Sequence, residues 1–135
     1  MGKRRRAREC AVQMLFQIDL SGVEPTEVYA QFWEAHDMET DVRAFSQELV
    51  DGVYAARDRL DAKIGAAAKR WRLERMAVVD RNILRMALYE MNRRPQTPTA
   101  VVIDEAIEVA RRFGTEESAR FVNGVLDALR PDTVK

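Results

Sequence analysis

The chain has 135 residues, of which 47% are hydrophobic and 33% charged, and its 22 basic and 22 acidic side chains give a formal net charge of zero. That length fits one domain with a sizeable core, and that composition is too apolar for a disordered protein. We find no secretory signal and no apolar run near the ~20 residues that cross a bilayer. One cysteine cannot form an internal disulfide, which agrees with a reducing compartment. Taken with the missing signal and apolar run, this makes us expect a cytoplasmic protein without a membrane segment.

The charges are sorted along the chain although they cancel overall. The net charge is +3 for residues 1–20, −7 for residues 21–61, +6 for residues 62–94 and −2 for residues 95–135. Such sorting predicts two separate electrostatic surfaces, which would suit two partners. Ordinary solvated helix faces would give the same pattern, and this alternative stays open.

Residues 3–20 are predicted to form an amphipathic helix. Its apolar stripe recurs at steps of three and four residues and consists of Ala7, Ala11, Met14, Leu15 and Ile18. On a helical wheel Arg5 and Phe16 lie about 160° and 180° from Ala7, and therefore face away from that stripe. Arg8 and Val12 lie beside them. We therefore expect one buried face and one outward face that carries charge and an aromatic ring.

The start of this helix is unusually basic. Five cations occupy it: Lys3, Arg4, Arg5, Arg6 and Arg8. Cations at a helix N-terminus oppose the helix dipole, so folding alone does not explain them. Single-stranded nucleic acid binds to cations that contact its phosphates and to rings that stack on its bases, and Phe16 would supply a ring. A solvated arm that keeps the chain soluble, with Phe16 in the core, is the alternative.

Two further helical spans complete the first half. The first runs to about residue 36, and Thr26 is its predicted N-cap. Apolar residues then recur every 3.6 residues from 42 to 71, which would make one helix about 45 Å long. A compact domain of this size has a radius of gyration near 14 Å. We therefore predict a break, preferably at Arg57-Asp58-Arg59, with Gly52 and Gly65 as other candidates.

The second half is predicted to contain a short turn at 72–76 and three helices. Asp80 can cap the first of them, which should be the most buried helix of this half. The second spans about 102–113, with Gly114 in the left-handed conformation and Thr115 as the next N-cap. Gly124, in the middle of the last helix, indicates that another helix crosses closely there. With no convincing strand, the fold class is all-α with about seven helices.

Motifs that carry catalysis are absent. There is no glycine-rich phosphate loop, no HExxH, no GxSxG and no CxxC. Cys10 falls on an apolar helix edge, and His36 has no second histidine or nearby cysteine with which to bind a metal ion. We therefore predict neither metal nor cofactor, and a protein that is not an enzyme.

Three blocks of sequence resemble one family. They are Arg4-Arg-Arg-Ala-Arg-Glu-Cys-Ala-Val-Gln13, Ile83-Leu-Arg-Met-Ala-Leu-Tyr-Glu-Met91 and Phe113-Gly-Thr-Glu-Glu-Ser-Ala-Arg-Phe-Val-Asn-Gly-Val-Leu-Asp127. Their order and spacing resemble the bacterial NusB transcription antitermination factors over nearly the whole chain. The resemblance implies one domain of two packed helical bundles, about 1–57 and 58–135. It also implies binding to boxA-type single-stranded RNA of nascent ribosomal RNA, with the ribosomal protein NusE, in the antitermination complex of RNA polymerase.

The resemblance also implies roles for single residues. The basic start from Lys3 to Arg8, Arg5 and Arg8 especially, would contact the RNA. Phe16 stands where relatives often have tyrosine, so stacking is kept and a hydroxyl is lost. Phe121 matches a second aromatic contact. Glu74 and Asp80 match acidic positions that face the ribosomal protein, and Asp80 could act as a helix cap instead.

Other interpretations remain. The chain could be a protein-interaction module whose basic arm only adds solubility. It could also be the RNA-binding domain type found in ribosomal RNA cytosine methyltransferases, although 135 residues leave no room for a catalytic domain. Whether it forms a homodimer is not decided by the sequence.

Overall fold

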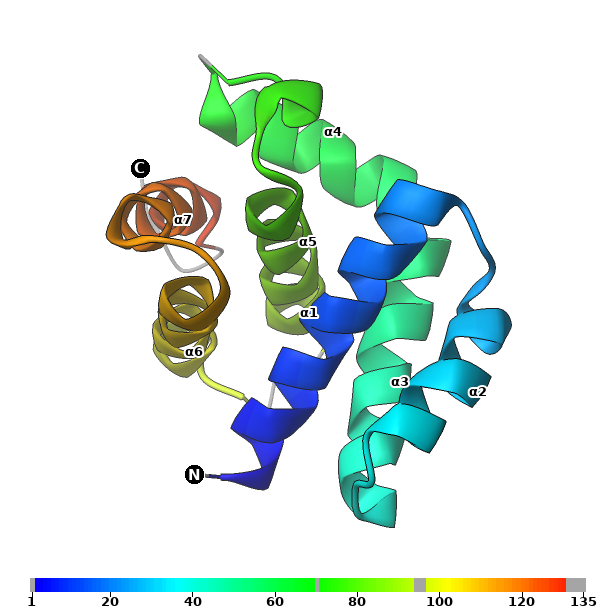
Figure 1. Ribbon diagram of the computed structural model, residues 1–135. Coiled ribbons are helices and arrows are strands. Elements are labelled where there is room, and N and C mark those ends of the chain that lie inside the picture. The colour runs from blue at the N-terminus through cyan, green and yellow to red at the C-terminus, as the bar shows by residue number, and fades with distance from the viewer. Residues whose placement is uncertain (1, 70, 94–96, 131–135) are drawn as a thin grey trace.

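The computed structural model describes residues 2–69, 71–93 and 97–130, and within these ranges it contains α-helices, one short 3-10 helix and no strand (Figure 1). The elements are α1 (Lys3–Ser21), α2 (Pro25–Ala35), α3 (Thr40–Ala55), α4 (Arg57–Ala68), η1 (Leu73–Arg75), α5 (Val78–Arg93), α6 (Thr99–Phe113) and α7 (Glu116–Leu129). The all-α prediction with about seven helices is confirmed. Over the described ranges, no helix combines the length and the apolar character that crossing a membrane requires.

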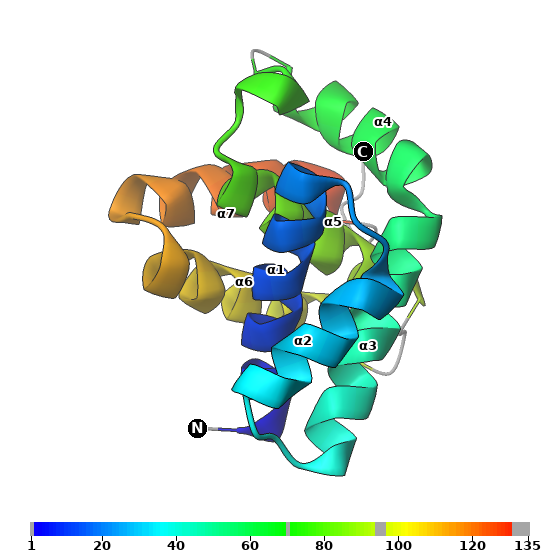
Figure 2. The ribbon, with the colours of Figure 1, turned by 45° about the vertical axis from the view of Figure 1, so that its right-hand side comes forward.

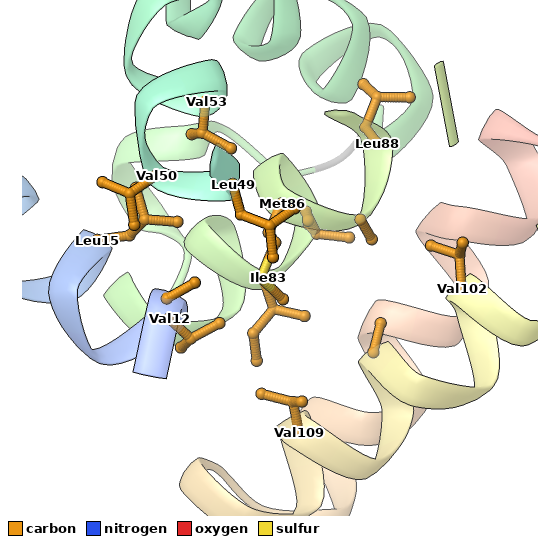
Figure 3. Packing of buried hydrophobic residues seen from close by; sticks show 14 of the residues in the cluster. Val12, Leu15, Leu49, Val50, Val53, Ile83, Met86, Leu88, Val102 and Val109 are labelled. Carbon is orange, nitrogen blue, oxygen red and sulfur yellow. The ribbon is translucent and has the colours of Figure 1, made fainter. Parts of the chain in front are cut away.

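Helix α5 is the centre of the fold. It lies between α1 and α3 on one side and α6 and α7 on the other, while α4 crosses one end (Figures 1 and 2). Figure 3 shows Ile83 and Met86 of α5 among side chains from α1, α3 and α6. Both residues are almost fully buried, so α5 is indeed the most enclosed helix of the second half.

Helix α1 is enclosed on more sides than its sequence predicts. Val12, expected on the outward face, is only 1% exposed, so that expectation is wrong. The reason is tertiary. Helix α1 packs against α2, α3, α5 and α6, so residues outside its single apolar stripe are also buried by these helices. Phe16 nevertheless stays outside, with 38% of its surface exposed, which answers the question that the sequence left open.

The predicted break in the long helical span is real. Helix α3 ends at Ala55 and α4 begins at Arg57, with Ala56 between them at φ −102° and ψ 13°. The predicted position was Arg57-Asp58-Arg59, one residue too late. The hydrophobic core runs through both sequence halves without interruption, so a division into bundles 1–57 and 58–135 stays a prediction, and residues 131–135 lie outside the described ranges.

Two helix ends differ from the prediction. Helix α2 begins at Pro25, which suits the first helical position, so Thr26 is not the N-cap. Gly114 has a φ of −122° and is not left-handed. A side chain is excluded there because a Cβ would lie 2.6 Å from Ser118 Oγ. Thr115 is the N-cap of α7 as predicted, since its hydroxyl accepts from the Ser118 amide at 3.1 Å.

Close helix approach occurs at Gly52 and not at Gly124. A Cβ on Gly52 would lie 2.1 Å from Cζ of Tyr89, so the ring of α5 lies directly on the backbone of α3. Around Gly124 a Cβ would meet no described atom within 4 Å, so the predicted helix crossing there is wrong. Gly52 therefore serves packing, and the helix continues through it without a break.

The Gly52 contact predicts opposite effects for two alanine substitutions. Gly52→Ala should lower the free energy of unfolding by about 1–3 kcal/mol, because the added methyl overlaps the Tyr89 ring and forces it to shift. Gly124→Ala should raise it by about 0.5–1 kcal/mol through helix propensity alone. Urea denaturation monitored by circular dichroism measures both. In a Tyr89→Ala background, Gly52→Ala should become stabilising; if it stays destabilising, the ring is not the cause.

Candidate nucleic-acid interface

Helices α1 and α6 cross each other and are joined by three ion pairs (Figure 2). Arg5 donates from Nε and Nη2 to the two carboxylate oxygens of Glu105, at 2.8 and 3.0 Å. One turn further along α1, Glu9 lies 3.7 Å from Nε of Arg112. These contacts hold the basic start of α1 against α6. The hydrogen bonds from Arg5 also hold the pKa of Glu105 below its usual value.

Arg8 is inside the protein, which corrects its predicted outward position. Its side chain is 5% exposed, and Nε donates to Glu90 of α5 at 2.9 Å in a bidentate contact. Glu105 is a further neighbour, 3.9 Å from Nη1. In this arrangement the guanidinium of Arg8 holds α1 against α5. A direct contact between Arg8 and RNA stays a prediction that this geometry does not favour.

The other cations of α1 are accessible. Lys3 lies 3.1–3.2 Å from the exposed carboxylates of Glu39 and Asp41, and exposed pairs of this kind contribute little to stability. The guanidinium of Arg4 lies 4.1 Å from the centroid of the Phe45 ring. Arg6 is exposed. A phosphate group can therefore exchange for the partners of these side chains at small cost.

A basic hollow opens where the starts of α1 and α6 meet. It encloses about 650 Å³ and is lined by Gly2, Arg4, Arg5, Arg8, Thr97, Val101 and Glu105. Neither helix has an acidic residue in its first turn or a side-chain cap, so their positive ends are not neutralised locally. The hollow therefore has the charge and the size to receive phosphate groups.

An aromatic groove follows along α1. Its volume is about 430 Å³, and its lining residues are Val12, Gln13, Phe16, Gln17, Phe32, His36, Val79 and Phe113. The exposed ring of Phe16 forms part of it, and the guanidinium of Arg112 lies 5.5 Å from the Phe113 ring. His36 stacks on Phe32 with ring centroids 4.1 Å apart, so its imidazole packs as part of the groove lining.

A third hollow, the Trp71 pocket, continues the line. It encloses about 400 Å³ and is lined by Trp71, Asp80, Thr115, Glu117, Ser118 and Phe121. Val79 lines the aromatic groove and the next residue, Asp80, lines this pocket, so the two are adjacent. Phe121 is half-buried, with its ring centroid 5.9 Å from that of Trp71. Phe16 therefore lines the aromatic groove and Phe121 lines the Trp71 pocket.

Asp80 is neither a helix cap nor a surface acid. Helix α5 begins at Val78, so Asp80 is its third residue and not its N-cap. It is 8% exposed, and its Oδ1 has no hydrogen-bond partner among the described residues. Burial raises the pKa of Asp80 above its usual value, and a hydrogen bond with Ser118 opposes that rise. Glu74, by contrast, is exposed on η1, so the two predicted partner contacts differ in access.

Sequence reasoning missed three residues of this surface. Glu105 and Arg112 belong to α6, whose apolar stripe gave no sign that its polar side faces α1. Trp71 was counted in an apolar helical series and therefore expected inside, yet it is 52% exposed. The basic residues next to Trp71 in the sequence, such as Arg72, could have indicated that this segment is exposed.

Groups that could carry catalysis or bind metal are not assembled here. In the described part of the chain, no three His, Cys, Asp or Glu side chains gather as metal ligands. Burial raises the pKa of the Cys10 thiol to about 11, which keeps it protonated and unreactive near neutral pH. The described surface contains the cations of α1, exposed or half-buried aromatic rings, and the unpaired Oδ1 of Asp80.

Comparison with known proteins places the chain in a family. Residues 5–131 match the model of the NusB family. The chain is 52% identical over 124 residues to the transcription antitermination protein NusB of Desulforudis audaxviator, covering 92% of this chain and 90% of that protein. It is 46% identical over 129 residues to NusB of Sorangium cellulosum, with 96% and 92% covered.

Solved structures agree with this assignment. A crystal form of T. maritima NusB is similar with a TM-score of 0.88 at 32% identity, over 98% of this chain and 93% of that one. A structure of the antitermination factors NusB and NusE in complex with dsRNA gives a TM-score of 0.87 at 26% identity, with 96% of each chain covered.

The buried ion pair of Arg8 and Glu90 predicts that a single substitution costs far more stability than the double substitution. Arg8→Met should lower the free energy of unfolding by about 3–5 kcal/mol, because it leaves the Glu90 carboxylate buried without a counter-charge. The double variant Arg8→Met/Glu90→Leu should recover most of that loss, because no buried charge remains. Chemical denaturation measures both, with Lys3→Met as a control that removes an exposed pair and should change little. An Arg8→Met protein as stable as the wild type would contradict this role for the pair.

Proposed function

This chain belongs to the NusB family of transcription antitermination factors, which are not enzymes, and from that premise we propose that it binds boxA-type single-stranded RNA of nascent ribosomal RNA together with the ribosomal protein NusE. The observation that supports the proposal most is that α1 carries accessible cations at its start and the exposed ring of Phe16 further along. Cations at one end would contact phosphates, and exposed rings further along would stack on bases.

The preference for a single strand is part of the proposal. One relative was solved with NusE and double-stranded RNA, and another similar structure is described as a plectonemic RNA supercoil. In an A-form duplex the bases are paired and stacked, so a ring on a protein surface cannot stack on them. Phe16 is exposed beside a groove that can receive a base only if that base is unpaired.

The protein partner would contact the acidic side chains near η1. Glu74 is exposed there, and a basic ribosomal protein would complement its charge. Asp80 is recessed, so a partner would reach it only with an inserted side chain. We propose that the resulting complex acts with RNA polymerase in the cytoplasm, where bacterial transcription takes place.

One observation favours a second candidate, a protein-interaction module with a solubilising arm. Lys3, Arg5 and Arg8 all contact carboxylates of this same chain, as purely structural cations would. Deletion of residues 1–6 separates the two functions. RNA binding should be lost and NusE binding retained if the arm holds RNA; a full-length chain that binds NusE and no RNA would favour the second candidate.

The central test is a titration with boxA-type, scrambled and duplex RNA, with and without NusE, at several salt concentrations. Contact of three to five cations with phosphates of a single strand predicts a slope of log K against log salt of roughly −2 to −3.5. The boxA-type strand should bind most tightly. A slope near zero, or equal affinity for duplex RNA, would contradict the proposal.

Phe16 provides a matched pair of variants. Phe16→Leu should weaken RNA binding by about 1–3 kcal/mol, because a leucine cannot stack on a base. Phe16→Tyr keeps the ring and should bind at least as tightly as the wild type. Fluorescence anisotropy measures the affinities, and thermal unfolding checks stability. If Phe16→Leu lowers stability and leaves RNA affinity unchanged, the ring belongs to the core and not to the interface.

A further inference from the structure

Arg112, near the end of α6, is an accessible cation without an assigned role. Its side chain is 58% exposed, and its Nε lies 3.7 Å from a carboxylate oxygen of Glu9, which is longer than an ordinary hydrogen bond. A loose pair that is open to water on the arginine side contributes little to stability, so another anion can replace the carboxylate at small cost. The neighbouring Arg111 differs, because it donates to Glu108 at 3.0 Å and to Glu116 at 3.2 Å.

The guanidinium of Arg112 lies at the rim of the aromatic groove. It is 5.5 Å from the centroid of the Phe113 ring, and Phe113 lines that groove together with Phe16. The described lining of the groove holds no aspartate and no glutamate. An anionic strand in the groove would therefore meet a cation at the rim and no acid along the lining. A guanidinium and aromatic rings beside one groove are typical of sites that bind single-stranded nucleic acid.

Arg112 also lies between the two features of α1 that the proposed function uses. On the side of α1 that faces α6, Arg5 pairs with Glu105. One turn further along α1, Glu9 pairs with Arg112, and Phe16 follows on the same side of the helix. Arg5 and Phe16 are eleven residues apart, which is about 16 Å along a helix. A strand that reaches from one to the other therefore carries phosphates past Arg112.

We propose that Arg112 contacts a phosphate of the RNA strand between the basic start of α1 and the ring of Phe16, and that this phosphate replaces Glu9 as its partner. The contact with the Phe113 ring does not depend on Glu9, so it keeps the guanidinium at the rim during the exchange. Every nucleotide carries a phosphate, so the contact adds affinity and no sequence preference. The inference rests on the proposed function and adds α6 to its RNA path. The acidic side chains near η1 are left to the protein partner.

Two neighbouring substitutions test this contact. Arg112→Gln and Arg111→Gln each remove one cation from adjacent positions of α6, so they change the net charge equally. Arg112→Gln should raise the Kd for boxA-type RNA roughly 3- to 30-fold at low salt and make the slope of log K against log salt shallower by about 0.7, as expected for one phosphate contact of a single strand. Arg111→Gln should change both quantities little. Arg112→Lys keeps the charge and should retain the slope.

Glu9→Gln gives a result that a folding defect would not produce. It removes the carboxylate that competes with the phosphate, so it should free Arg112 and lower the Kd for RNA roughly 2- to 5-fold. The same substitution in an Arg112→Gln background should have much less effect, because the cation that it frees is gone. Thermal unfolding of each variant checks the fold. A full gain in affinity without Arg112 would overturn the inference.

The outcomes separate this inference from the function on which it rests. A phosphate contact requires that Arg112→Gln weaken binding of boxA-type and scrambled RNA by the same factor; a changed ratio would mean that Arg112 reads a base, and would overturn the inference. If the wild type binds RNA while Arg112→Gln behaves like Arg111→Gln, or loses affinity for NusE alone, the inference is overturned and the proposed function stands. If the wild type binds no RNA, the proposed function itself fails, and the inference fails with it.

Discussion

The contact between Arg8 and Glu90 joins α1 to α5, and the arrangement of the other helices depends on that junction. Both side chains are almost fully buried, so the pair has lost its hydration and is compensated by its bidentate geometry, with Glu105 as a further carboxylate 3.9 Å from Nη1 of Arg8. Such a pair tolerates one register of the two helices and penalises the alternatives. It is therefore better understood as a determinant of position than as a source of net stability.

A second polar network fixes the other end of the same helices. Asp19 of α1 accepts from Arg81, Asn82 and Arg85 of α5, and Arg85 in turn contacts Asp61 of α4. Burial alone would raise the pKa of Asp19, but the donors around it lower that pKa below its usual value. With polar contacts at both ends and the apolar core between them, α1 cannot slide or rotate on α5. The ring of Phe16 is thereby held at the surface.

Because α1 is fixed on α5, the side chains of the candidate interface are held in place by the fold. The basic hollow, the aromatic groove and the Trp71 pocket are formed by side chains from α1, α2, α5, α6, α7 and the segment before η1, each placed by packing elsewhere in the molecule. Lys3 pairs with exposed acids of the same chain, and the pair of Arg5 with Glu105 is partly buried. A ligand with phosphates can replace such partners without disturbing the buried pair of Arg8, because the pair lies beneath the surface and not on it.

The helices and the family were determined by sequence alone, because the 3.6-residue period, the glycine and proline positions and the three blocks of resemblance are local signals. Phe16 on the outer face of α1 and Thr115 as a cap follow from the same local rules. Tertiary structure decided the rest. Val12 is buried because four helices surround α1. Arg8 is buried because Glu90, 82 positions away, supplies a bidentate counter-charge inside the protein. Trp71 is exposed because α4 ends before it, so the helical period from 42 to 71 does not hold there. Burial of this kind depends on partners distant in sequence, and periodicity along one helix carries no information about them.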